Sequence, residues 1–215
     1  MNKEISKTII VARHGVLYNP SGKIYNRDSV MRKEDWMHLS DEGKAGMEKL
    51  AKDISSLSGH FPVIFSSPSI RAIESSRILA SILHIPKIVP KEDLDDVLCR
   101  KPYEQGMTMK ELEKLHGDIY DVCLETPEEV AERMVKVFWE MYDYIRPGET
   151  GTLVSHGDPI GWLTHKLINN ALPSPKNIRD ELYPPKSGAF EFIIEKQGAI
   201  SSWRTLHNTF DKNIY

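Results

Sequence analysis

The chain has 215 residues, of which 40% are hydrophobic and 27% charged, a balance that is typical of an ordinary globular protein. We therefore expect a single domain over residues 1–215. The formal net charge of −3 gives no overall attraction to nucleic acid or to an anionic membrane, so any anion would have to be bound by a local cluster of cations.

Targeting and metal-binding signals are also missing from the sequence. No apolar stretch approaches the ~20 residues that a membrane helix needs, and residues 1–7 lack the apolar run of a secretory signal, so we expect a cytoplasmic protein. Cys99 and Cys123 have no CxxC or CxxH partner, and no HExxH-type spacing occurs. We expect neither a disulfide framework nor a metal site, and no cofactor.

Short apolar runs predict buried strands at residues 8–12, 63–65 and 152–155, and each run ends in polar residues. Helices are expected between them because capping residues precede apolar positions at helical spacing. One helix begins after Ser40, and a second covers residues 69–83. A third begins after Thr126 with Pro127 at its first position, and a fourth covers residues 159–168.

Alternation of strands and helices predicts an α/β fold with a mostly parallel sheet that helices cover on both faces. Residues 189–194 and 200–206, separated by Gln197-Gly198, are expected to form an antiparallel hairpin at its edge. The long irregular segments 16–38, 91–107 and 170–187 are expected to frame a ligand crevice at the carboxyl ends of the parallel strands.

Three polar groups directly follow the predicted strands, so the carboxyl ends of these strands should bring the groups to one edge of the sheet. They are Arg13-His14-Gly15, Ser66-Ser67-Pro68 leading to Arg71, and Ser155-His156-Gly157. Arginine can hold two phosphate oxygens with its planar fork, and helix N-termini at the same edge add N–H donors. The sequence therefore predicts a phosphate site.

The histidines add chemistry to this anion site. A neutral imidazole is a competent nucleophile, and attack on phosphorus would give a phosphohistidine that water then hydrolyses. The other histidine, beside a bound dianion, should be protonated and donate to the oxygens that carry charge in the transition state. Taken singly, each residue is more readily interpreted as a satisfied loop histidine or a solvated arginine, and only the ordered set favours catalysis.

The segments Val11-Ala12-Arg13-His14-Gly15, Ser66-Ser67-Pro68-Ser69-Ile70-Arg71-Ala72 and Val154-Ser155-His156-Gly157 closely resemble the RHG, SSPxxRA and SHG motifs of the histidine phosphatase superfamily, branch 1, which is phosphoglycerate-mutase-like. The resemblance, which also includes the helix start at residues 39–43, runs from about Ile9 to Ile160. It implies a three-layer α/β/α sandwich, a nucleophile at His14, and phosphate ligands at Arg13, Arg71 and His156. Asn19 lies near a phosphate-binding asparagine of the family, although its spacing is one residue short, and an ordinary turn residue is the alternative.

Ester cleavage also needs a proton donor for the leaving oxygen. Asp96, in Leu94-Asp95-Asp96, matches the position of the glutamate that serves in the phosphoglycerate-mutase branch, provided that an insertion precedes Gly106. Asp158 resembles the aspartate of the acid-phosphatase branch, but Gly157 separates it from His156 and an early helix position also suits an N-terminal cap. We favour Asp96 and leave Asp158 open.

We therefore expect a metal-independent phosphomonoester hydrolase acting on a small phosphorylated metabolite. The alternatives are a phosphoglycerate mutase, a phosphoprotein phosphatase and a catalytically silent phospho-ligand binder. Residues 98–103 do not reproduce the mutase segment, and an intact nucleophile argues against a silent binder. Arg100 and Lys101 are either ligands for an acidic substrate or a solvated loop. The sequence leaves the substrate and the oligomeric state open, a homodimer included.

Overall fold

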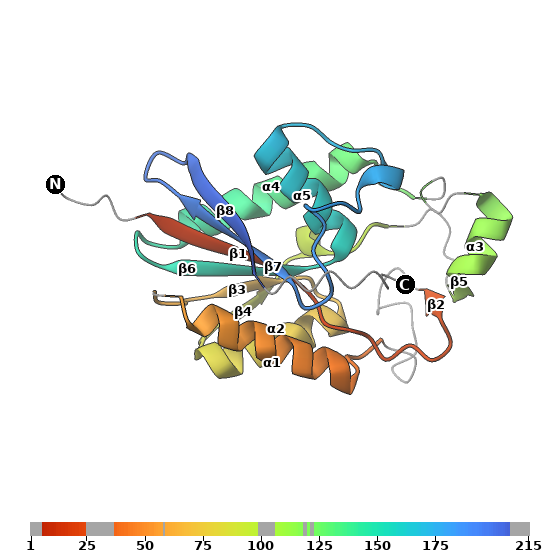
Figure 1. Cartoon of the computed structure of the whole chain (residues 1–215), viewed down its shortest axis with the longest axis horizontal. Helices are drawn as coiled ribbons and strands as arrows, with labels where there is room; N and C mark the ends of the chain where they lie inside the picture. Colours follow the sequence, from red (N-terminus) through yellow and green to blue (C-terminus); the bar gives the residue numbers. More distant parts are fainter. Residues whose placement is uncertain are drawn as a thin grey trace.

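The computed structural model describes residues 6–24, 37–57, 59–98, 106–117, 120 and 123–206. Within these residues the main sheet has six strands in the order β4-β3-β6-β1-β7-β8 (Figure 1). Neighbouring strands are parallel among β1 (Lys7–Arg13), β3 (Ile64–Ser66), β4 (Ile88–Pro90) and β6 (Thr150–Ser155). The last two strands, β7 (Ala189–Ile194) and β8 (Ile200–Leu206), form the predicted antiparallel hairpin at the edge.

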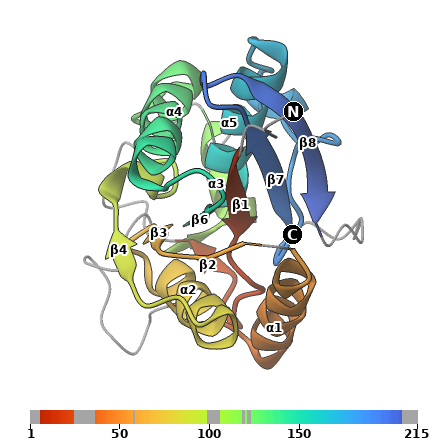
Figure 2. The same cartoon turned by 90° about the vertical axis from the view of Figure 1, so that its left-hand side faces the viewer.

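Helices cover both faces of this sheet and make the three-layer sandwich that was predicted (Figure 2). One face carries α1 (Asp41–Ser55) and α2 (Ile70–Leu83), and the opposite face carries α4 (Pro127–Tyr144) and α5 (Gly157–Asn169). Strand β1 shows why both layers form. Ile9 and Val11 are buried in the core beneath α4 and α5, whereas Ile10 and Ala12 are buried beneath α1 and α2.

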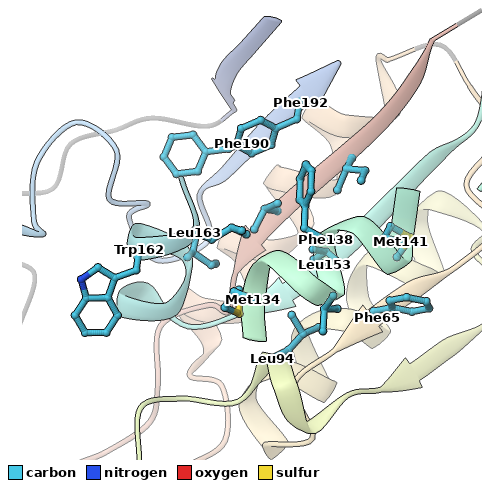
Figure 3. Packing of buried hydrophobic residues seen from close by; sticks show 14 of the residues in the cluster. Phe65, Leu94, Met134, Phe138, Met141, Leu153, Trp162, Leu163, Phe190 and Phe192 are labelled. Carbon is cyan, nitrogen blue, oxygen red and sulfur yellow. The ribbon is translucent and has the colours of Figure 1, made fainter. Parts of the chain in front are cut away.

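The larger core lies under α4 and α5, where aliphatic and aromatic side chains pack together (Figure 3). Phe138 of α4 meets Phe192 of β7 edge-on, with ring centroids 5.4 Å apart. Apolar residues from helix, strand and loop thus fix α5, and with it the residues at its start, against the sheet. In the described part of the chain, no helix is long and apolar enough to cross a membrane.

Helices α1 and α4 begin where the capping signals predict. The Ser40 hydroxyl accepts from the Gly43 N–H at the start of α1, and Thr126 forms a complete capping box with Glu129 at the start of α4. Helix α5 begins at Gly157, two residues earlier than expected, and its N-cap is His156 rather than Asp158. The interpretation of Asp158 as the cap is therefore wrong.

Several short elements lie in segments that were expected to be irregular. The strands β2 (Lys23–Ile24) and β5 (Met107–Thr108) pair as a small antiparallel sheet, and β5 leads into helix α3 (Met109–His116). Two short 3-10 helices, η3 (Glu92–Leu94) and η6 (Pro175–Asn177), complete the described elements. Segment 91–107 therefore begins with a short 3-10 helix at the carboxyl end of β4.

Candidate active site

The carboxyl ends of β1, β3 and β6 bring the predicted residues together. Arg13 ends β1 and His14 follows it. His156 follows β6, and Arg71 lies in the first turn of α2, the helix that follows β3. All four side chains are buried: their exposed fractions are 8% for Arg13, 4% for His14, 3% for Arg71 and 1% for His156. The two imidazole rings meet edge-on with centroids 5.1 Å apart.

The environment of His14 favours its neutral form. Its Nδ1 lies 2.8 Å from the carbonyl oxygen of Gly15, which can only accept, so Nδ1 carries the proton and Nε2 keeps its lone pair. Burial lowers the pKa of His14 well below 6.5, and the positive charges of His156, Arg71 and Arg13 lower it further. A buried imidazole that is neutral near pH 7 is suited to nucleophilic attack.

Each arginine has at least one donor that is paired and one that is unpaired among the described residues. Arg13 donates from Nη1 to the carbonyl oxygen of Pro184 at 3.0 Å, and Arg71 donates from Nη2 to Asp96 Oδ2 at 3.1 Å. In the described part of the chain, Arg13 Nε and Arg71 Nη1 are buried without any hydrogen-bond partner. Leaving such donors unpaired in a buried site is costly, and an oxyanion would satisfy both of them.

His156 is held from both sides of its ring. On one side, Nδ1 receives the Arg71 Nε–H at 3.2 Å and lies 3.4 Å from Asp96 Oδ2. On the other, Nε2 lies 2.9 Å from Ser67 Oγ and 3.6 Å from Asp95 Oδ1. Two consecutive carboxylates thus face opposite nitrogens of one imidazole.

Asp95 is a site residue that the sequence reasoning missed. Its carboxylate is 4% exposed and accepts from the Ser67 hydroxyl at 2.9 Å. Burial raises the pKa of Asp95, but hydrogen bonding and charge from His156, together with the Ser67 hydroxyl, outweigh burial and bring the pKa to about 2. The ionised carboxylate therefore fixes the Nε2 side of His156.

Asp96 reaches the cluster, as predicted for a proton donor, and its side chain is 37% exposed. Burial raises its pKa, yet the charges of His156 and Arg71 outweigh burial and lower it below 3.8. Asp96 is therefore ionised in the free protein at neutral pH. A bound phosphate dianion would oppose the same cations and favour protonation.

Asp158, the rival carboxylate, is engaged elsewhere. Its oxygens accept from the hydroxyls of Tyr120 and Tyr183, each at 2.8 Å. The Tyr183 ring also lies against Arg13, with the guanidinium carbon 5.1 Å from the ring centroid. Asp158 thus holds Tyr183, which in turn supports Arg13.

Gly157 is required by this crowding. A Cβ at this position would lie 2.1 Å from the Tyr183 hydroxyl and 2.8 Å from the guanidinium carbon of Arg13, well inside contact distance. The glycine after His156 therefore allows Arg13 and Tyr183 to approach the start of α5.

Asn19 makes local contacts in the segment that follows β1. Asn19 donates from Nδ2 to the carbonyl oxygen of Lys23 at 2.7 Å and accepts from Ser21 Oγ at 3.1 Å, which favours the interpretation as a turn residue. Arg100 and Lys101 lie outside the described residues. Among the residues that are described, no group of three or more His, Cys, Asp or Glu side chains could hold a metal ion.

Fold and site together define an α/β protein whose parallel strands bring a buried cluster of two arginines and two histidines to their carboxyl ends. Residues 9–181 match the sequence profile of the histidine phosphatase superfamily (branch 1), and the chain belongs to this superfamily. No curated protein sequence matches it significantly.

Solved structures of phosphatases share the fold. The α-ribazole phosphatase of Shigella flexneri is 15% identical, with 94% of this chain and 96% of that chain covered and a TM-score of 0.69. Phosphoserine phosphatase of Entamoeba histolytica, in complex with 3-phosphoglyceric acid, is 20% identical, with coverages of 94% and 98% and a TM-score of 0.67. A mycobacterial glucosyl-3-phosphoglycerate phosphatase is 16% identical, with coverages of 93% and 97% and a TM-score of 0.66.

Proposed function

We propose that this chain is a metal-independent phosphomonoester hydrolase that transfers the phosphoryl group of a small phosphorylated metabolite to His14 and then to water. One observation carries the proposal. Buried, unpaired donors on Arg13 and Arg71 lie in the same cluster as an imidazole whose pKa is lowered, so the site combines an oxyanion pocket with a neutral nucleophile. Phosphatase activity among structures of the same fold agrees with this assignment.

In the first step, phosphate oxygens take the free donors of Arg13 and Arg71, and His156 holds the Arg71 guanidinium in place by accepting its Nε–H at Nδ1. Nε2 of His14 attacks phosphorus, the bond between phosphorus and the ester oxygen breaks, and the leaving oxygen takes a proton from Asp96. The arginines stabilise charge on the transferred group in the way that a metal ion does elsewhere.

In the second step, water attacks the phosphohistidine. Asp96, now a carboxylate, accepts the proton from this water, while the bond between phosphorus and His14 breaks and inorganic phosphate leaves. The two steps return both side chains to their protonation states in the substrate complex, and Asp96 takes its proton from solvent as the dianion binds and releases it when phosphate leaves. Asp95 and Ser67 contribute by keeping His156 oriented throughout.

A screen of phosphorylated metabolites for phosphate release, in excess EDTA, tests the proposal. A 3-phosphoglycerate mutase assay with and without 2,3-bisphosphoglycerate should run beside it. We expect phosphate release that EDTA does not reduce. Isomerisation without net phosphate release would instead identify a mutase, and activity that returns only after a divalent ion is added would refute the metal-free mechanism.

A further inference from the structure

Lys186 lies in a segment that is fastened to the proposed nucleophile. The Ser187 N–H donates to the carbonyl oxygen of His14 at 3.2 Å, and the Arg13 N–H donates to the carbonyl oxygen of Gly188 at 2.9 Å. The Arg13 side chain adds its bond to the carbonyl oxygen of Pro184. Residues on both sides of Lys186 are therefore anchored on Arg13 and His14, which places Lys186 at the edge of the site.

A tight turn fixes the backbone of Lys186. The Gly188 N–H donates to the carbonyl oxygen of Pro185 at 2.9 Å, and Ser187 has a φ of 59°, which non-glycine residues rarely adopt. Ser187 packs on α1 so closely that a Cβ at Gly46 would lie 2.6 Å from Ser187 Oγ. Strand β1 and helix α1 thus hold the turn from two sides. The unfavourable backbone conformation of Ser187 is of a kind that is often found at functional sites.

Lys186 is half-buried, and within the described residues its amine has no hydrogen bond or ion pair. Burial lowers its pKa, the charge of Arg13 lowers it further, and the charge of Glu42 raises it. A cation near a second cation, without a paired acceptor, is a poor arrangement for stability alone and a suitable one for an anionic ligand.

We propose that Lys186 binds a carboxylate of the substrate, so that the preferred substrate is a small phosphorylated acid. This inference rests on the proposed function because it takes the pocket of Arg13 and Arg71 as the phosphate site. A carboxylate fits better than a second phosphate dianion, since Lys186 supplies one positive charge and Glu42 lies within electrostatic reach. Lys186 would then determine specificity without touching the transferred phosphoryl group.

Binding measurements test this inference independently of turnover. We would measure the Kd of 3-phosphoglycerate and of glycerol 3-phosphate, which has a hydroxymethyl group in place of the carboxylate, by calorimetry with full-length His14→Ala protein. The Kd of each ligand is then measured for double variants that carry Lys186→Met or Lys186→Gln in addition to His14→Ala. Lys44→Met is the matched control, because Lys44 is a solvent-exposed α1 lysine that pairs with Asp41.

We expect the His14→Ala protein to bind 3-phosphoglycerate at least about tenfold more tightly than glycerol 3-phosphate. A factor of this size is the scale of one hydrogen bond to a charged group. Lys186→Met and Lys186→Gln should reduce this preference to about twofold or less while changing glycerol 3-phosphate binding little, and Lys44→Met should preserve it. Equal binding of the two ligands, or a preference that survives both Lys186 variants, would overturn the inference alone. Failure of both ligands to bind would refute the phosphate pocket as well, whereas binding without hydrolysis in the metabolite screen would refute only the proposed function.

Discussion

Replacement of Arg71 by lysine tests whether the fork geometry of this side chain matters beyond its charge. Arg71 is 3% exposed and points three nitrogens in different directions: Nε to His156, Nη2 to Asp96, and an unpaired Nη1. A lysine ammonium is a single point that cannot reach all three positions. Removing one well-placed donor to developing charge costs about 2–4 kcal/mol, so kcat/KM should fall about 30-fold to 1,000-fold.

The assay is kcat/KM with p-nitrophenyl phosphate, together with the inhibition constant of vanadate, whose oxygens should meet the same donors. Vanadate should inhibit the parent enzyme competitively and the Arg71→Lys variant much less strongly. Arg77→Lys is the matched control because Arg77 is exposed on the same helix, α2, and its replacement should be nearly neutral. If Arg71→Lys retains activity within about twofold of the parent while remaining folded, the proposed role of Arg71 is wrong.

Three further predictions concern the acid, the nucleophile and the packing of the site. Asp96→Asn should slow esters with poor leaving groups by roughly 100-fold or more but p-nitrophenyl phosphate much less, and the appearance of this dependence in Asp158→Asn instead would identify the other carboxylate as the acid. Because the pKa of His14 is lowered, its ring should stay neutral as the pH falls through 6.5 and protonate only at lower pH, and a resolved NMR titration with a midpoint at or above 6.5 would contradict this. Gly157→Ala should lower the free energy of unfolding by about 1–3 kcal/mol, measured by urea denaturation, because the new methyl group meets the Tyr183 hydroxyl; unchanged stability would show that the site tolerates repacking.

The sequence was sufficient for the features that depend on local signals. Capping residues at Ser40 and Thr126 located α1 and α4, and β-branched runs ending in polar residues located three of the parallel strands. Because parallel strands end at a shared edge, these local assignments alone predicted that His14 and His156 would meet. The Thr108–Glu111 capping box of α3 was an available signal that the sequence reasoning did not use.

Other features depend on contacts between distant parts of the chain and could not be predicted in this way. Asp95 and Asp96 lie against opposite nitrogens of His156, and only the fold brings this ring within reach of both carboxylates. The bond between Arg13 and Pro184 joins residues 171 positions apart. Strand β4 spans three residues, too short for a periodicity to be recognised.

The most direct test of the central claim is to trap the phosphoenzyme. Rapid acid-free quenching after mixing with a radiolabelled phosphate ester, followed by peptide mapping, should give an acid-labile, alkali-stable label on His14. The His14→Ala variant should show neither label nor turnover, because Nε2 of His14 is the atom that the proposed mechanism brings to phosphorus. A label on another residue, or labelling and turnover that persist in His14→Ala, would contradict the assignment of His14 as the nucleophile.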